Sequence, residues 1–261
     1  MKPTDVSDPQ YYHRVVDCQW ACPAHTNVPE YIRLIAQGRF TDAYMVNRDS
    51  NVFPGILGRV CDRPCEPPCR RGRVEAKPVA ICRLKRVAAD HRDDDITARL
   101  PKIPRIKNGK RIACIGAGCA SLTVANDLMP LGYEVTIFEQ YGEPGGLMRT
   151  NIPAFRLPAP VLDEEIAMIV DMGVDLRLNS PVRSMRELLE KSGFDAVFVG
   201  SGAPKGKELK LPGRQEGAAN IHIGIAWLES VGFGHIDRVG GGGLILGGGN
   251  TPRGWCRRGP R

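Results

Sequence analysis

The sequence has few aromatic residues and no long apolar run. Aromatic side chains make up 6% of the 261 residues and are scattered along the chain, which argues against a base-stacking surface for nucleic acid. No stretch approaches the roughly 18 apolar residues of a membrane-spanning helix. The first ten residues, MKPTDVSDPQ, are polar with no apolar run behind them, so we expect no secretory signal peptide. These absences predict a cytoplasmic protein that binds neither a membrane nor nucleic acid.

The net charge of +7 comes mainly from two segments. Residues 251–261 contain four arginines and no acidic residue, and residues 58–92 contain ten basic and four acidic residues. The second segment also contains several cysteines. Because a metal bound by thiolates carries negative charge, basic neighbours would stabilise it. The charge pattern therefore indicates a metal centre better than a nucleic-acid interface.

Six of the nine cysteines lie in the first third of the chain. A chain of this length does not need disulfides to build a core, so clustered cysteines point to metal or redox chemistry. The candidate metal ligands are Cys18, Cys22, Cys61, Cys65, Cys69 and Cys82. The prolines of CDRPCEPPC exclude a regular helix through residues 61–69, and thiolates on such a loop favour an iron–sulfur cluster. Structural zinc and free thiols remain alternatives.

The apolar pattern changes along the chain. Residues 28–38, 39–50 and 78–91 carry apolar residues at helical spacing. A charged, proline-containing linker follows, and we place a domain boundary near residue 104. Beyond it, short apolar strands alternate with helices, which predicts an α/β domain with a parallel sheet. A further strand is expected within GGGGLILGGGN, residues 240–250.

The segment GAGCAS follows the first predicted strand and opens a helix. Gly116, Ala117 and Gly118 match the start of a dinucleotide-binding turn, in which glycine lets the backbone approach a pyrophosphate, while Ser121 replaces the third glycine. Glu139 ends the next strand, where an acid accepts hydrogen bonds from ribose hydroxyls. The later segment GEPGGLM offers Gly145, Gly146 and Leu147 as a second loop near the ligand. An ordinary tight turn is the alternative.

Taken in order, these motifs resemble a known family. ACPAHTNVPEYI, GRVCDRPCEPPCRRG and KPVAI resemble the amino-terminal iron–sulfur domain of the NADPH-dependent glutamate synthase small subunit and of dihydropyrimidine dehydrogenase. IGAGCASLTVANDL and GYEVTIFEQYGEPGGLM resemble the FAD-binding domain that follows in that family. LILGGGNT is similar to the start of its NAD(P)H-binding domain, with Gly247, Gly248 and Gly249 in the turn. The resemblance covers residues 11 to about 251.

The resemblance implies two 4Fe–4S clusters, FAD, and electrons that pass between NAD(P)H and a partner subunit or domain. One family cluster corresponds to Cys22, Cys61 and Cys65 with a Glu or Gln as its fourth ligand, but that position is Lys85 here. A cation is a poor ligand, so we expect Cys82, three residues earlier, to replace it. The second cluster would keep only Cys18 and Cys69. We therefore expect one cluster and at most a weak second one.

Three regions follow from the resemblance: a helical iron–sulfur domain with its linker (1–104), a Rossmann-like FAD-binding domain (105–237) and the start of an NAD(P)H-binding domain (238–261). The final segment, PRGWCRRGPR, cannot form the helix that follows the turn in the family. Its composition is typical of an out-of-frame reading, so we expect a frame shift after Thr251, a shortened chain and no hydride transfer by this chain alone. Two alternatives are a non-catalytic cluster-bearing adaptor and an enzyme whose NAD(P)H domain lies on another chain.

Overall fold

The computed structural model describes residues 16–94, 96–208, 211–236, 242–247 and 249. The chain divides into two compact units between Pro101 and Lys102. Gly248, Thr251 and the segment PRGWCRRGPR lie outside the described residues. Within the described part, no helix is long and apolar enough to span a membrane.

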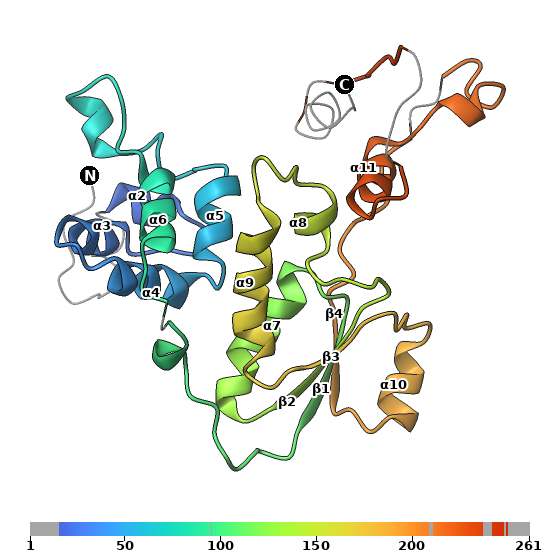
Figure 1. Ribbon diagram of the computed structural model, residues 1–261, viewed down its shortest axis with the longest axis horizontal. Helices are drawn as coiled ribbons and strands as arrows, with labels where there is room; N and C mark the ends of the chain where they lie inside the picture. The colour runs from blue at the N-terminus through green and yellow to red at the C-terminus, as the bar shows by residue number, and fades with distance from the viewer. Residues whose placement is uncertain (1–15, 95, 209–210, 237–241, 248, 250–261) are drawn as a thin grey trace, which may run out of the picture. The chain divides into compact units, whose positions relative to one another are not determined.

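The first unit is built from short helices (Figure 1). Asn27 caps α3 by accepting a hydrogen bond from the Glu30 backbone N–H, Pro29 lies in the first turn, and Gly38 follows the end with a φ of +72°. These signals explain why the helix predicted over residues 28–38 forms. The helices are α2 (Asp17–Ala21), α3 (Val28–Ala36), α4 (Phe40–Ser50), α5 (Pro54–Val60) and α6 (Ile81–Asp90), with 3-10 turns η1 (Arg70–Arg73) and η2 (Thr97–Arg99).

Helix α6 packs against α3, α4 and α5. Tyr31, Leu34, Ile81 and Ala88 are buried together in the core of this unit, and the side chain of Cys65 packs among them. Residues 61–69 connect α5 to η1 without a helix, as their prolines predict. The cysteine loop is therefore anchored to the helical core through one of its own thiol side chains.

The second unit contains a parallel four-stranded sheet in the order β3-β2-β1-β4. The strands are β1 (Arg111–Ile115), β2 (Glu134–Phe138), β3 (Asp175–Arg177) and β4 (Ala196–Val199). The chain adds β2 and β3 on one side of β1 and then returns to place β4 on the other side. In such a sheet, ligands bind beyond the carboxyl ends of the strands where the order reverses, which here is the end of β1 and β4.

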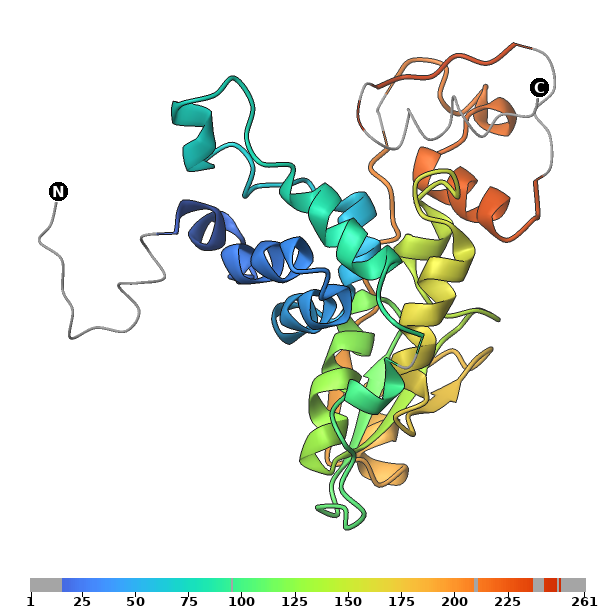
Figure 2. The same ribbon diagram turned by 60° about the vertical axis from the view of Figure 1, so that its left-hand side comes forward.

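Helices cover both faces of this sheet, with α7 and α9 on one side and α10 on the other (Figures 1 and 2). Pro130 lies in a 3-10 turn directly after α7, so the helix ends early, as this proline predicts. The elements are α7 (Cys119–Leu128), η3 (Met129–Leu131), α8 (Leu147–Thr150), α9 (Ala159–Val170), α10 (Met185–Lys191), η4 (Ala218–Asn220) and α11 (Gly224–Gly232).

The strand predicted within residues 240–250 is wrong for the part of that segment that the structure describes. Residues 242–247 form neither strand nor helix, and Leu244 and Leu246 are exposed. A strand needs a neighbouring strand to satisfy its backbone hydrogen bonds. Among the described residues, the segment 242–247 pairs with none of the four strands of the sheet.

Candidate functional site

The cysteine site lies entirely in the first unit. Cys22 and Cys61 directly follow α2 and α5, and Cys82 is the second residue of α6. Cys65 and Cys82 are buried, Cys18, Cys22, Cys61 and Cys69 are partly buried, and all six are free thiols. Residues far apart in the sequence therefore place their thiols in one region of the unit.

The thiols fall into two groups. Cys82 forms hydrogen bonds with both Cys61 and Cys65, and Cys22 faces the same lysine, Lys85, as these three. Cys18 instead interacts electrostatically with Cys69. The resemblance implies the same two sets of cysteines, and their roles as ligands stay a prediction.

Three contacts from different segments hold Cys82 in the larger group. Gly58 of α5 lies against α6 so closely that a Cβ atom there would be 2.7 Å from the Arg86 Cα. The Tyr31 hydroxyl donates to the Ile81 carbonyl at 3.0 Å. The Cys82 backbone N–H donates to the Glu66 carboxylate at 3.2 Å. The Glu66 contact also ties the cysteine loop to the start of α6.

The thiols differ in how readily they ionise. The hydrogen bond with Cys82 raises the pKa of Cys61, and the one that Cys65 accepts from Cys82 lowers the pKa of Cys65 in spite of its burial. The pKa of Cys82 is raised to about 11. Its interaction with Cys61 lowers this pKa, but its interaction with Cys65 and its burial raise the pKa by more. The lowered pKa of Cys65 favours its thiolate form.

Cys22 also has a lowered pKa. Burial raises the pKa of Cys22, but hydrogen bonds with Thr26 and with the Ala24 backbone and the positive charge of Lys85 lower that pKa by more. Thiolates are the form that binds soft metals and iron–sulfur clusters, so the chemistry of this donor set fits such a group. Among the described residues, no three His, Cys, Asp or Glu side chains have the arrangement that holds a single metal ion. The thiols are grouped without forming a closed ion site.

The glycine turn of the second unit begins at the end of β1. Gly116 has a φ of +90°, its N–H donates to the Phe138 carbonyl at 2.7 Å, and a Cβ atom there would lie 2.8 Å from the Gly200 carbonyl oxygen. Only glycine fits that position. Gly118 precedes the first residue of α7, and a Cβ atom there would meet nothing within 4 Å. The turn is thus tightly packed at its first glycine and open at its second.

The second glycine loop packs directly on this turn. The Gly145 N–H donates to the Ala117 carbonyl at 2.8 Å, and a Cβ atom on Gly146 would lie 3.1 Å from the Gly118 Cα. Leu147 then begins α8 and is exposed. The predicted residues of both glycine segments therefore lie together in the structure.

Ser121 replaces the third glycine at a crowded position. Its side chain is fully buried, and its hydroxyl has no hydrogen-bond partner among the described residues. A Cβ atom on Gly200 would lie 2.1 Å from the Ser121 Oγ. The third glycine of the motif allows close packing of helix and strand; here Ser121 fits because glycine stands opposite it after β4.

Glu139, which is 5% exposed, connects the turn to the end of β2. One carboxylate oxygen accepts the Ala117 N–H at 2.7 Å, and the other accepts the Tyr141 N–H at 3.0 Å. A carboxylate can accept about four hydrogen bonds, so positions remain for ribose hydroxyls. Glu139 thus orders the protein's own turn in addition to the role that the sequence predicts for it.

We expect Glu139→Ala to lower the free energy of unfolding by about 2–4 kcal/mol, because the buried Ala117 N–H and the partly buried Tyr141 N–H lose a charged acceptor. Urea denaturation of the full chain measures this change. Glu143→Ala is the matched control: Glu143 is exposed in its ion pair with Arg149, and its removal should cost less than about 1 kcal/mol. Equal losses in the two variants would contradict the role given to Glu139.

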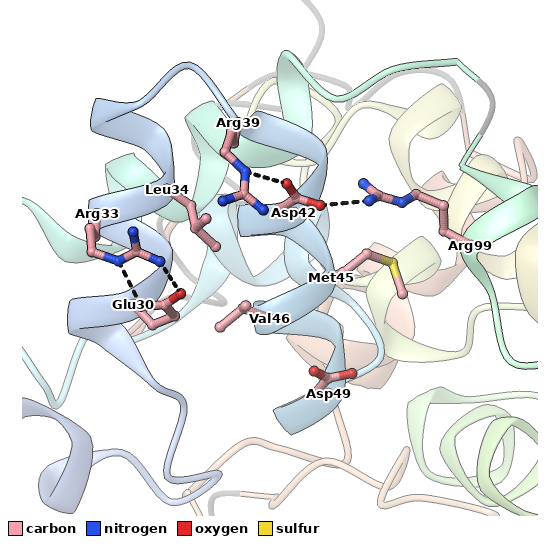
Figure 3. Close-up of a pocket in the computed structure, with 9 residues that line it drawn as sticks. All are labelled: Glu30, Arg33, Leu34, Arg39, Asp42, Met45, Val46, Asp49 and Arg99. Atoms are coloured by element: carbon pink, nitrogen blue, oxygen red, sulfur yellow. Dashed lines mark hydrogen bonds and ion pairs between the residues drawn. The ribbon is translucent and has the colours of Figure 1, made fainter.

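A separate groove lies between α3 and α4 (Figure 3). Arg39 and Arg99 both point toward Asp42 with contacts of 2.6 Å. Arg33 forms an ion pair with Glu30. None of the residues predicted to bind a cofactor lines this groove, and its arginines already neutralise neighbouring acids.

Sequence reasoning missed Tyr31, Gly58 and Glu66 as residues that position the thiol group. Tyr31 and Gly58 contact α6 although they are distant from it in the sequence, and no local sequence pattern indicates such a contact. Glu66 carried one available signal, because an acid between two cysteines of a basic loop is unexpected unless it has a structural partner.

Comparisons with known proteins agree with this division into two sites. Residues 12–96 match the family described as dihydropyrimidine dehydrogenase domain II, 4Fe–4S cluster. Residues 114–176 match the NAD(P)-binding Rossmann-like domain. The helical cluster domain followed by a Rossmann-like parallel sheet is thereby confirmed as the fold class.

Curated relatives share sequence with nearly the whole chain. It is 36% identical over 259 residues to the NADPH-Fe(3+) oxidoreductase subunit beta of Geobacter sulfurreducens, covering 95% of this chain and 38% of the relative. It is 37% identical over 238 residues to the NAD-dependent dihydropyrimidine dehydrogenase subunit PreT of Salmonella typhimurium, covering 90% and 56%. It is 32% identical over 251 residues to the glutamate synthase (NADPH) small chain of Azospirillum brasilense, covering 90% and 51%. The chain thus spans about half or less of the length of these relatives.

Proposed function

We propose that this chain moves electrons between NAD(P)H and a partner protein through FAD and a 4Fe–4S cluster. The chain belongs to the family of iron–sulfur oxidoreductases that includes the glutamate synthase small chain and dihydropyrimidine dehydrogenase. The observation that carries the proposal is the group of Cys61, Cys65 and Cys82, two of them buried, within a domain that matches the 4Fe–4S cluster family. Relatives named as subunits of larger oxidoreductases support a protein partner.

The cluster would be held by Cys22, Cys61, Cys65 and Cys82, and it would supply one-electron transfer. Burial of Cys65 and Cys82 excludes water from two of the four proposed ligands. Glu66 and Tyr31 fix the start of α6 and hence the position of Cys82. Cys18 and Cys69 form at most a weaker second site, because two thiols alone leave half of the ligand positions of such a cluster unfilled.

FAD would bind across the glycine turn of the second unit, where it would exchange electron pairs with nicotinamide and single electrons with the cluster. The backbone at Gly116, Ala117 and Gly118 and the start of α7 would accept its pyrophosphate. Glu139 would bind its ribose, and Gly145, Gly146 and Leu147 would line the same ligand. Ser121 would pack the helix on the strand beneath it. Gly247 and Gly249 stay predicted contacts of NAD(P)H, as does Gly248 outside the described residues.

Anaerobic purification of the chain, followed by iron, sulfide and flavin analysis, tests this function. We expect about four iron and four sulfide atoms per chain, together with bound FAD that is released by denaturation. Iron and sulfide without flavin, even after incubation with FAD, would favour the non-catalytic adaptor. Zinc in place of iron would contradict the cluster.

A further inference from the structure

Lys85 is a buried lysine beside the thiol group. It is 6% exposed and lies on α6, where Cys82 and Ala89 share its buried face at spacings of three and four residues. Lysine is almost never buried to this degree unless a negative group compensates its charge. The position of Lys85 therefore requires an anionic partner inside the unit.

The structure shows which groups Lys85 faces. Its ammonium interacts electrostatically with the thiols of Cys22, Cys61, Cys65 and Cys82, which come from α2, the cysteine loop and α6. Tyr31, packed beside the same thiols, stays neutral because burial and the cysteine charges raise its pKa. The amino terminus of α6 adds its positive dipole end next to Cys82. Lys85 and the amino terminus of α6 thus place positive charge on the α6 side of the thiols.

We propose that Lys85 is the fixed counter-charge of this thiol group and that it raises the reduction potential of the cluster held there. This inference rests on the proposed function. One-electron reduction adds one negative charge to the group bound by the thiols, with the electron supplied by the reduced flavin or by an added reductant. A nearby buried cation stabilises the more negative reduced form, because the low-dielectric interior screens their attraction only weakly.

The test compares the wild type, Lys85→Leu, Lys85→Arg and Lys77→Leu, each as the full chain purified anaerobically; leucine removes the charge without adding the glutamine ligand that the family carries at this position. The proteins are titrated with dithionite, and the reduced cluster is followed by electron paramagnetic resonance. In Lys85→Leu we expect the equilibrium constant for reduction to fall about tenfold, which is about 59 mV toward lower potential for one electron. Lys85→Arg keeps the charge and should stay near the wild-type potential.

Lys77→Leu is the matched control, because Lys77 is exposed and belongs to the same basic segment. It removes the same formal charge where water and salt screen it, so its potential should equal that of the wild type. Equal potentials in Lys85→Leu and Lys77→Leu would overturn the proposal, and so would a fall in Lys85→Arg as large as in Lys85→Leu.

Loss of the cluster also gives a clear answer. A cluster that is retained in Lys85→Arg but lost in Lys85→Leu supports a role for the charge. A cluster that is lost in both shows that Lys85 acts through its shape, and this overturns the proposal. Absence of iron from the wild type contradicts the proposed function, whereas equal potentials in iron-loaded proteins contradict only the role of Lys85.

Discussion

A Cys82→Ser variant is expected to lose most of its iron and sulfide during anaerobic purification. Cys82 forms hydrogen bonds with Cys61 and Cys65 and lies in the first turn of α6, so its removal takes one of four proposed ligands from the centre of the group. A serine hydroxyl is a much poorer ligand for iron than a thiolate. Iron and sulfide analysis and the visible absorption of the cluster measure the loss.

Two cysteine variants serve as controls for this experiment. Cys119 is an exposed thiol of the second unit, so Cys119→Ser should keep the full iron content. Cys69→Ser tests the second group, and we expect it to keep the cluster because Cys69 interacts with Cys18 rather than with Cys82. Full iron content in Cys82→Ser would rule out Cys82 as a ligand. Complete loss in Cys69→Ser would show that the cysteines are divided differently.

Local signals in the sequence were sufficient to predict most of the helices and strands of the fold. The helix over residues 28–38 forms because a capping residue, a first-turn proline and a closing glycine act within one short segment. The glycine turn forms because Gly116 adopts a conformation that other residues rarely adopt. Each of these features depends on residues close together in the chain, so a single sequence contains the information needed to predict them.

Contacts between distant segments could not be predicted in the same way. The Tyr31 hydrogen bond to Ile81 joins residues 50 positions apart, and the burial of Lys85 depends on how α6 packs against three other helices. The sequence indicated that Lys85 is a poor ligand, but not that it is buried where its charge acts on four thiols. The failed strand prediction has a related cause. The segment around Leu244 and Leu246 has the apolar pattern of a strand, but it has no neighbouring strand among the described residues.

A Gly118→Ala variant is expected to fold like the wild type and to bind FAD at least tenfold more weakly. Gly118 has φ −81° and ψ 179°, which alanine adopts without strain, and its added Cβ would meet no atom within 4 Å. In the proposed complex, that open space is where the pyrophosphate approaches the backbone, so the methyl group would displace it. Thermal unfolding measured without ligand and FAD titration by flavin fluorescence separate the two effects.

Gly116→Ala should behave in the opposite way, because it strains the backbone and brings Cβ to 2.8 Å from the Gly200 oxygen. Its melting temperature should fall even without FAD. Gly242→Ala is the neutral control, since a Cβ there would also meet nothing within 4 Å and the residue lies outside the glycine turn. If Gly118→Ala binds FAD as tightly as Gly242→Ala, the open face of Gly118 is not where the pyrophosphate approaches. Weak binding by Gly118→Ala with an unchanged melting temperature would place the ligand against that face, since neither strain nor unfolding could account for the loss.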